Sequence, residues 1–373
     1  MERALARSRD RFSETRSANR RRIRLMIVDD STVARAVLSR MVETDPSFEI
    51  TAVAGTAEDA IEALAECRVD IVVLDLEMPG AGGLKSIPRI IAAAGGAKVL
   101  IVSSLADEGA EQTVAALALG AADTMPKPGT GRFNGKFSEV LLGKLKALGY
   151  AAEPIAERPA AKNEDGYLYL RATPTDPIDI LAIGASTGGI HAVGALFSNL
   201  PKRIGVPILV TQHLPVPFMS VFARQLGVVA GRETLVAEEG MELAPDRILV
   251  APGDAHLTLD PTPAGPVVRL TKGRSSSGCM PSLDPMLASV GAIYGAGALG
   301  VVLTGIGRDG VEGSTRLVAC GGSIIAQDEA SCAVWGMPRA VLEAGLASAV
   351  LSPEKIARRI ASRTEESPRA NKR

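Results

Sequence analysis

Two series of short apolar runs restrict the fold of this chain more than any other feature. The first, from Arg24, contains "RLMIV", "EITAVAG", "DIVVLD", "AKVLIVS" and "AADTMPK", and the second, from Ile178, contains "IDILAIG", "VPILVTQH", "RILVAPG", "LGVVLTG" and "SIIAQD". Segments with helical spacing of apolar residues lie between these runs. Strands that alternate with helices form a parallel sheet covered on both faces. The sequence therefore predicts an α/β protein with two doubly wound parallel-sheet domains.

The segments outside these two series differ in composition. Residues 1–22 are rich in Arg and Ser without apolar periodicity, which predicts a disordered basic tail. Residues 147–176 gain Pro, Ala and charge, which is typical of a linker. We therefore expect domains at residues 23–146 and 177–353, followed by a polar tail at residues 354–373.

The overall composition excludes several classes of protein. Lys and Arg total 41 against 42 for Asp and Glu, so no net charge favours nucleic acid or an anionic membrane. The four cysteines are scattered and form no CxxC, so we expect structural thiols and no zinc cluster. No apolar segment typical of a secretory signal is present near Met1. We expect a cytoplasmic protein that neither binds nucleic acid nor inserts into a membrane.

Acidic residues follow two strands of the first predicted sheet. Asp29 and Asp30 follow the first strand and Asp75 the third, while Ser103 ends the fourth and Lys127 the fifth. Ligands of parallel sheets gather beyond the carboxyl ends of the strands, so these residues converge. Three carboxylates repel one another unless a cation lies between them, and oxygen ligands suit Mg²⁺. A carboxylate beside Mg²⁺ and an ammonium can accept a phosphoryl group, and Asp75 is the expected acceptor.

The motifs "VDDS", "LDLEMPG", "VSS" and "PKP" resemble those of the receiver domain of bacterial response regulators over residues 23–145. The resemblance implies that a histidine kinase phosphorylates Asp75, that Ser103 is the switch hydroxyl and that Lys127 contacts the phosphoryl group. It also implies a Mg²⁺ site made of Asp29, Asp30, Asp75 and the backbone carbonyl of Glu77. Gly82 departs from the family, whose members often have Asp there, so the cap of the following helix can differ.

A serine lies in a glycine-rich turn at the start of the second domain. Gly184 to Gly188 matches G-x-S-x-G between a strand and a helix, where a nucleophilic serine is found in hydrolases. A phosphate-binding turn or a helix cap at Ser186 are the alternatives. Of the three histidines, His191 lies on the same helix as Ser186, whereas His213 follows the next strand at the same edge. His213 is the expected base, and His256 is the second candidate.

The acid that orients the base must follow His213, because no Asp or Glu lies between Ser186 and His213. Asp309, in "LGVVLTGIGRDG", follows a strand and is the expected partner. His256 with Asp246 or Asp254 is the alternative pairing.

A dinucleotide site is a rival interpretation of the same region. Gly305 to Gly310 matches G-x-G-x-x-G, and Asp328 resembles a ribose-binding acid. This interpretation is disfavoured because the negative charge of Asp309 would lie beside that of the pyrophosphate.

The motifs "GASTGG", "TQHLP", "APGDAH", "PSLD", "TGIGRDG" and "QDEASCAVWGMPRA" resemble the catalytic domain of chemotaxis protein-glutamate methylesterases over residues 177–350. The resemblance implies that Ser186 is the nucleophile, His213 the base and Asp309 its orienting acid. Thr187, His256 and Ile306 lie at motif positions near that site. The residues after "STGG", Ile190 and His191, depart from the family, as does Ile306, which replaces the usual methionine.

The two resemblances together imply a phosphorylation-activated serine esterase. It would hydrolyse glutamate methyl esters on the cytoplasmic helices of chemoreceptors, release methanol, and deamidate receptor glutamines. The receiver domain would cover the catalytic cleft until Asp75 is phosphorylated. We expect Mg²⁺ in the receiver domain, no cofactor in the catalytic domain, and a monomer. The alternative is a non-catalytic module that binds receptors or adaptors.

Overall fold

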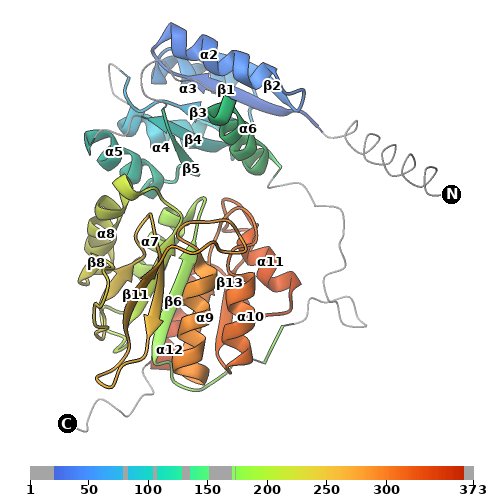
Figure 1. Cartoon of the computed structure of the whole chain (residues 1–373). Coiled ribbons are helices and arrows are strands. Elements are labelled where there is room, and N and C mark those ends of the chain that lie inside the picture. The colour runs from blue at the N-terminus through green and yellow to red at the C-terminus, as the bar shows by residue number, and fades with distance from the viewer. Residues whose placement is uncertain are drawn as a thin grey trace, which may run out of the picture. The chain divides into compact units, whose positions relative to one another are not determined.

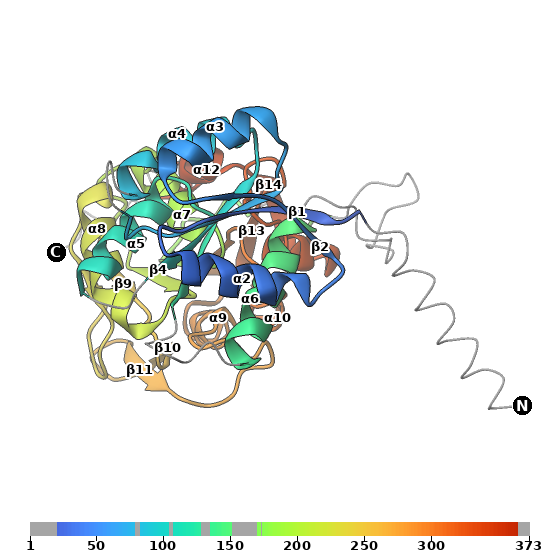
Figure 2. The ribbon, with the colours of Figure 1, turned by 90° about the horizontal axis from the view of Figure 1, so that it is seen from above.

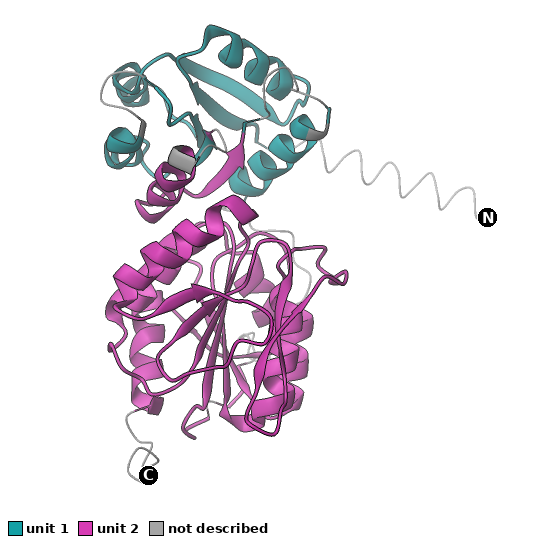
Figure 3. Cartoon of the chain, turned by 60° about the vertical axis from the view of Figure 1, so that its left-hand side comes forward, with its two compact units in different colours: residues 1–102, 127–150 teal, residues 103–126, 151–373 magenta. Residues whose placement is uncertain are grey.

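The computed structural model describes residues 21–78, 83–103, 107–127, 135–150, 170–172 and 174–364. The predicted basic tail up to residue 20, Gly82 and most of the predicted linker lie outside the described residues. The chain divides into two compact units, residues 1–102 with 127–150 and residues 103–126 with 151–373 (Figure 3). The domain boundaries expected at residues 23, 146 and 177 remain predictions.

The first series of strands forms a five-stranded sheet in the order β2-β1-β3-β4-β5 (Figure 1). Strand β1 pairs in parallel with β2 and β3, and β3 pairs in parallel with β4. The strands are β1 (Ile23–Val28), β2 (Phe48–Ala54), β3 (Ile71–Leu74), β4 (Lys98–Ser103) and β5 (Asp123–Pro126). The helices are α2 (Thr32–Glu43), α3 (Ala57–Glu66), α4 (Gly83–Ala93), α5 (Asp107–Ala118) and α6 (Gly135–Gly149).

Helices cover both faces of this sheet, as the alternation of strands and helices predicts. Seen from above, α3 and α4 lie on one side of β1, and α2 and α6 lie on the other (Figure 2). Local hydrogen bonds fix the starts of two of these helices. Ser31 Oγ accepts a hydrogen bond from Ala34 N, and Thr56 Oγ1 accepts one from Asp59 N. Such N-caps satisfy backbone donors that the first turn of a helix leaves unpaired.

The second series forms a seven-stranded sheet in the order β14-β13-β12-β6-β7-β9-β8, in which every adjacent pair is parallel. Its strands are β6 (Ile180–Ala185), β7 (Ile208–Gln212), β8 (Thr234–Val236), β9 (Ile248–Val250), β12 (Ala298–Val302), β13 (Ser323–Gln327) and β14 (Ala347–Leu351). An antiparallel hairpin, β10 (His256–Asp260) with β11 (Val267–Thr271), stands apart from the sheet. The doubly wound architecture is confirmed, but β8, β14 and the hairpin were not predicted.

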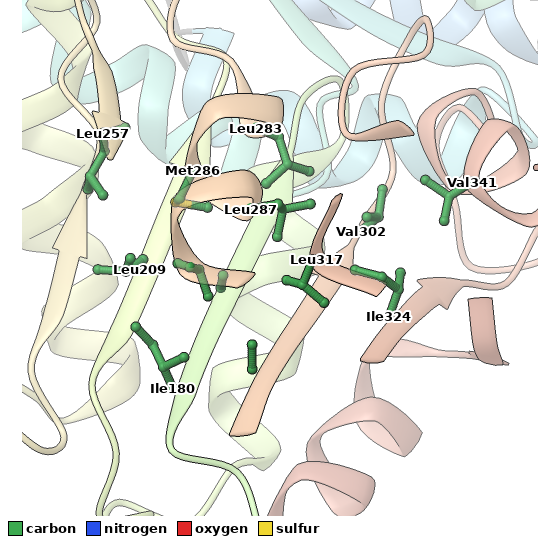
Figure 4. Packing of buried hydrophobic residues seen from close by; sticks show 14 of the residues in the cluster. Ile180, Leu209, Leu257, Leu283, Met286, Leu287, Val302, Leu317, Ile324 and Val341 are labelled. Carbon is green, nitrogen blue, oxygen red and sulfur yellow. The ribbon is translucent and has the colours of Figure 1, made fainter. Parts of the chain in front are cut away.

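The helices of this part are α7 (Gly189–Asn199), α8 (Val216–Ala230), α9 (Leu283–Tyr294), α10 (Val311–Ala319), α11 (Met337–Glu343) and α12 (Pro353–Thr364), with a short 3₁₀ turn η1 (Gly295–Gly297). The core gathers between α9 and the central strands. Leu283, Met286 and Leu287 of α9 are fully buried against residues of β6, β7 and β12 (Figure 4). This packing anchors the start of α9 beside the carboxyl edge of the sheet, where the catalytic candidates lie.

The C-terminal boundary differs from the expected one. We expected a polar tail from residue 354, but Pro353–Thr364 forms α12, in which Ile356 and Ile360 are fully buried. The folded part therefore extends at least to Thr364. The sequence did not predict this helix, because most of its residues are polar or charged and its apolar positions are few. No helix in the described part of the chain has both the length and the apolar character needed to cross a membrane.

Candidate active site and acidic pocket

The acidic residues of the first series lie together at the carboxyl ends of their strands. Asp29 and Asp75 are buried and Asp30 is exposed, and one carboxylate oxygen of each lies within 4.8 Å of the others. Backbone amides orient the two buried groups, since Ser31 N donates to Asp29 Oδ1 and Glu77 N donates to Asp75 Oδ1. The geometry thus brings the three predicted carboxylates to one point.

Lys127, which follows β5, supplies the positive charge of this pocket. Its Nζ lies 2.7 Å from Asp75 Oδ2 and 3.0 Å from Asp29 Oδ2. Burial raises the pKa of Asp75, and the hydrogen bond from Lys127 opposes that rise. Burial lowers the pKa of Lys127, but the hydrogen bonds to Asp75 and Asp29 outweigh it and the pKa lies above its ordinary value. Lys127 therefore stays charged and neutralises part of the acidic pocket.

Ser103 is the last residue of β4, and its hydroxyl is buried. Its Oγ lies 2.6 Å from Thr113 Oγ1, on α5. The hydroxyl predicted to act as a switch is therefore held by a helix of the same region. Thr113 carries no signal in the sequence, because a single threonine on a helix is common.

The turn after β6 holds Ser186 by its backbone. Ser186 N donates to Thr304 O at 3.0 Å, and Gln212 Nε2 donates to Ser186 O at 2.9 Å. Thr304 Oγ1 also donates to the carbonyl of Thr187 at 2.9 Å. Strand β7 and the loop after β12 therefore supply the groups that fix the turn.

Two glycines of this turn are required for different reasons. Gly188 has φ +75°, a left-handed conformation that favours glycine. A Cβ at Gly189 would lie 2.2 Å from Gln212 Oε1 and 2.7 Å from the Ala185 Cβ. Gly188 and Gly189 thus permit a tight turn in which the start of α7 approaches the neighbouring strand. The half-buried Ser186 side chain lies on this turn.

The expected base and acid meet at the same edge. His213 directly follows β7, and its backbone N donates to Ala185 O at 3.1 Å, next to Ser186. Its Nε2 lies 2.8 Å from Asp309 Oδ2. Asp309 is buried in the loop between β12 and α10, and it also accepts hydrogen bonds from Ser282 Oγ at 2.6 Å and Leu283 N at 2.7 Å. Within the described residues, no hydrogen bond joins the Ser186 hydroxyl to His213.

The charges of the pair reinforce each other. Burial alone would lower the pKa of His213, but the hydrogen bonds with Asp309 and Cys279 outweigh burial and raise it to about 9. Burial alone would raise the pKa of Asp309, yet the hydrogen bonds from His213, Leu283 and Ser282 hold it well below its usual range. Asp309 is therefore an anion that stabilises a positive charge on the imidazole, as an orienting acid must be.

In the described part of the chain, no hydrogen bond joins His256 to His213 or Asp309. It is buried, its Nδ1 accepts from Ser282 N at 2.9 Å, and its Nε2 lies 2.8 Å from Gly273 O. Because Nδ1 accepts from a backbone N–H, the contact of Nε2 with Gly273 O is one in which Nε2 donates. It positions Ser282, whose hydroxyl in turn holds Asp309. Sequence reasoning missed Ser282, although "PSLD" was among the resembling motifs.

The remaining predicted residues border the turn. Thr187 is buried, with its carbonyl held by Thr304, and Ile306 is half-buried between two glycines of the Asp309 loop. His191 is exposed on α7. Thr304 and Gln212 were not predicted as site residues, because nothing in their local sequence shows that they cross to the serine turn.

The alternative pairing of His256 with Asp246 or Asp254 receives no support. Asp246 Oδ1 accepts from Ile204 N and Gly205 N, and Asp254 forms an exposed ion pair with Lys272 at 2.8 Å. Both carboxylates are thus engaged away from His256, whose partners are Ser282 and Gly273.

The two acidic residues of the dinucleotide interpretation, Asp309 and Asp328, already form hydrogen bonds with other residues of the chain. Asp309 is bound to His213, and Asp328 Oδ1 accepts from both the backbone and the hydroxyl of Ser331. The glycines around Asp309 instead permit close packing, because a Cβ at Gly305 would lie 2.7 Å from the Ser186 Cβ. The loop therefore serves the serine turn and the carboxylate.

Cys279 is a further residue that the sequence did not mark. It is half-buried in the loop before α9, and its sulfur, a ring nitrogen of His213 and a carboxylate oxygen of Asp309 all lie within 4.8 Å of one another. We expected the scattered cysteines to be structural thiols, and that expectation did not include the approach of Cys279 to the catalytic candidates.

Comparison with known proteins gives two family matches that together span most of the chain. The CheB methylesterase family matches residues 181–360, and the response regulator receiver domain family matches residues 25–132. A solved structure, the CheB methylesterase catalytic domain of Thermotoga maritima, has a TM-score of 0.48 and 35% identity over 49% of this chain and 97% of that chain.

Curated relatives match over nearly their whole length. A protein-glutamate methylesterase/protein-glutamine glutaminase 1 of Paramagnetospirillum magneticum is 37% identical, over 90% of this chain and 94% of the relative. Proteins with the same activities from Azospirillum brasilense and Caulobacter vibrioides are each 39% identical, over 91% of this chain and 93% and 99% of the relatives, respectively.

Proposed function

Because the chain belongs to the CheB family of protein-glutamate methylesterases/protein-glutamine glutaminases, we propose that Ser186, His213 and Asp309 form its catalytic triad. The protein is a phosphorylation-regulated methylesterase of chemotaxis that also deamidates glutamine. The observation that carries the triad assignment is the 2.8 Å contact between His213 and a buried Asp309, at the sheet edge where the Ser186 turn lies. The non-catalytic alternative is not favoured.

The proposed reaction begins with attack by the Ser186 oxygen on the carbonyl carbon of a glutamate methyl ester. His213 Nδ1 takes the hydroxyl proton, because Nε2 is occupied by Asp309. The tetrahedral intermediate collapses, the imidazolium gives its proton to the departing methoxide, and methanol leaves. A water molecule then attacks the acyl-enzyme with His213 again as base, which restores Ser186 and yields glutamate. With a glutamine substrate, the leaving group is ammonia.

Asp309 has two tasks in this scheme. It fixes the ring of His213 with Nε2 protonated, and its charge stabilises the imidazolium formed when Ser186 loses its proton. Ser282 Oγ and Leu283 N hold the carboxylate in place from the other side. Thr187, Ile306 and His256 are proposed to shape or support the site. Backbone N–H groups of the surrounding loops would stabilise the oxyanion, and one such donor contributes about 3–4 kcal/mol in other hydrolases.

The receiver part is proposed to accept a phosphoryl group on Asp75 from a histidine kinase. The donor set fits Mg²⁺, because Asp29, Asp30 and Asp75 present only carboxylate oxygens, and these lie within 4.8 Å of one another. The backbone carbonyl of Glu77 is the proposed fourth ligand. Bound Mg²⁺ would neutralise charge on the transferred phosphoryl oxygens.

Lys127 and Ser103 are the proposed partners of the phosphorylated Asp75. Lys127 already contacts Asp75, so its ammonium is placed to bind a phosphoryl oxygen. Ser103 would exchange its hydrogen bond with Thr113 for one to the phosphoryl group. Such an exchange couples the charge added by phosphorylation to α5.

Further proposals concern the setting of the reaction. The substrate is a methylated chemoreceptor, and we propose that its cytoplasmic helices carry the reactive esters. We also propose that the protein acts in the cytoplasm as a monomer, requires no cofactor in its catalytic part, and binds no nucleic acid. We propose that the receiver part restrains catalysis until Asp75 is phosphorylated.

The experiment that tests the triad measures methanol released from methyl-labelled receptor, with a small phosphodonor and Mg²⁺ present. We expect Ser186→Ala to lower the rate by about 10⁴- to 10⁶-fold, as loss of a nucleophilic serine does elsewhere. Ser198→Ala, which removes an exposed hydroxyl from α7, is the matched control and should retain the wild-type rate. Equal rates for folded Ser186→Ala and wild type would contradict the assignment.

A further inference from the structure

The cysteine beside the proposed triad adds a sulfur atom to a group of nitrogen and oxygen atoms that could together bind a metal ion. Cys279 forms no disulfide and is half-buried, and its sulfur lies within 4.8 Å of both a His213 ring nitrogen and an Asp309 carboxylate oxygen. The proposed esterase reaction uses His213 and Asp309 but has no step for a thiol. The position of Cys279 therefore needs a separate account.

A thiolate, an imidazole and a carboxylate form a donor set that suits Zn²⁺. Thiolate ligands select zinc and other soft metals over Mg²⁺ and Ca²⁺, which prefer oxygen ligands. Three protein ligands leave one position of a tetrahedral ion open to water. This site thus differs in kind from the oxygen-only pocket at Asp75.

The surrounding hydrogen bonds also suit a metal ligand. Asp309 is held by Ser282 Oγ and Leu283 N, and such outer contacts orient the carboxylates that bind metals. Ser282 lies three residues after Cys279, so the same loop carries the thiol and fixes the carboxylate. The hydrogen bond from Ser282 N to His256 Nδ1 holds Ser282 in place.

We propose that His213, Cys279 and Asp309 bind a thiophilic divalent cation of the Zn²⁺ class, and that this binding inhibits the esterase. The cation replaces the proton shared by His213 Nε2 and Asp309 Oδ2, which lie 2.8 Å apart. The ring proton then resides on Nδ1, and the Cys279 thiol releases its proton on binding. With Nδ1 protonated and Nε2 bound to the cation, His213 cannot accept the Ser186 proton.

The binding experiment uses the full chain in excess Mg²⁺, which fills the oxygen-only pocket, and Co²⁺ as the probe. A thiolate bound to Co²⁺ gives a ligand-to-metal charge-transfer band. We expect this band at one Co²⁺ per wild-type chain, with loss of the band when Zn²⁺ is added. Cys279→Ser should abolish it and weaken Co²⁺ binding by at least about 100-fold, since loss of an outer contact alone costs 10- to 100-fold.

Cys320→Ser is the matched control, because Cys320 is an exposed cysteine of the same unit. It should retain the band and the wild-type affinity. Circular dichroism verifies the fold of each variant, and Cys279→Ala replaces Cys279→Ser if the serine variant does not fold. Absence of the band in wild type, or its persistence without Cys279, overturns the proposal.

The inhibition experiment rests on the proposed function, and its result is interpreted independently of the Co²⁺ binding result. Zn²⁺ should inhibit methanol release by wild type and Cys320→Ser, relative to each variant's own metal-free rate, and Cys279→Ser should need about 100-fold more Zn²⁺. A Co²⁺ band without inhibition overturns the inhibitory role. No methanol release by metal-free wild type contradicts the proposed function instead, and the Co²⁺ band still decides the metal site.

Discussion

The Asp309 carboxylate lies 2.8 Å from His213 through Oδ2 and accepts a second hydrogen bond from Ser282 through Oδ1. The imidazole is therefore oriented by a group that is itself held in place. This arrangement leaves Nδ1 of His213 as the nitrogen that can receive a proton from Ser186. The contact between His213 Nε2 and Asp309 Oδ2 therefore decides which nitrogen takes part in the proposed proton transfer.

Replacement of Asp309 by asparagine tests that orientation. We expect Asp309→Asn to lower kcat for ester hydrolysis by about 10⁴-fold, because the amide favours the wrong tautomer of His213 and removes the negative charge. Methanol release under saturating receptor measures the effect. Asp254→Asn is the control, since Asp254 is an exposed acid paired with Lys272 and belonged to the alternative pairing. A large loss in Asp254→Asn and none in Asp309→Asn would reverse the assignment.

The raised pKa of His213 predicts an alkaline rise in activity. A general base must be neutral, and the pKa of His213 is about 9 in the folded protein. We therefore expect kcat/KM to rise about tenfold per pH unit through neutral pH and to level off above about pH 9. The rate of Ser186→Ala at each pH, subtracted from the wild-type rate, corrects for hydrolysis by hydroxide. A profile that is flat from pH 6 to 9 would contradict the role of His213 as base.

The raised pKa of His213 also makes stability depend on pH, in the direction opposite to activity. The folded pKa of His213 exceeds the ordinary value of 6.5, so its charged contact with Asp309 contributes fully below about pH 6.5 and is lost as the pH rises through about 9. Asp309 behaves in the reverse sense, because its pKa is lowered and its contribution is lost only in acid. Activity and this part of the stability should therefore change in opposite directions between pH 6.5 and 9.

Strand periodicity was enough to predict the two parallel sheets. Residues that end strands, such as Asp75 and His213, could be placed at the carboxyl edge because parallel strands align their ends there. The spacing of apolar residues also predicted helices between the strands, and α2 and α3, which begin after the N-caps Ser31 and Thr56, are two of them. Features that depend on local pattern and sheet polarity can thus be predicted directly from the sequence.

Contacts between distant loops were not predictable in this way. Ser282 and Cys279 lie close to the proposed triad because α9 packs its first turn, at Leu283, against the sheet core. Nothing in the local sequence around Cys279 specifies that approach, which depends on tertiary packing. The hairpin that begins at His256 and the helix α12 were missed for a related reason, since short or strongly charged elements give weak periodicity.

Asp75→Asn should uncouple the esterase from its phosphodonor. The amide cannot form the acyl phosphate, so we expect no incorporation of labelled phosphoryl group and no stimulation of methanol release by the donor. Asp59→Asn is the control, because Asp59 is an exposed acid on α3 outside the pocket. Labelling of Asp75→Asn equal to that of wild type would show that another residue accepts the phosphoryl group.

A chain that lacks residues 1–176 tests whether the receiver part restrains catalysis. If the receiver part restrains catalysis, this shorter chain should release methanol faster than unphosphorylated full-length protein and should not respond to the phosphodonor. Circular dichroism and a cooperative thermal transition establish that it folds. A folded short chain with no more activity than the unphosphorylated whole would rule out simple inhibition by the receiver part.

Two glycines of α7 give a matched test of the packing behind Ser186. A Cβ at Gly189 would lie 2.2 Å from Gln212 Oε1, so Gly189→Ala should destabilise the protein by about 1–3 kcal/mol through overpacking. It should also lower kcat, because displacement of Gln212 disturbs its hydrogen bond to Ser186 O. Gly194 has no atom within 4 Å of such a Cβ, so Gly194→Ala should stabilise the helix by about 0.5–1 kcal/mol and leave kcat unchanged. Denaturant unfolding and methanol release measure both effects, and equal behaviour of the two variants would show that the Gly189 contact does not hold the turn.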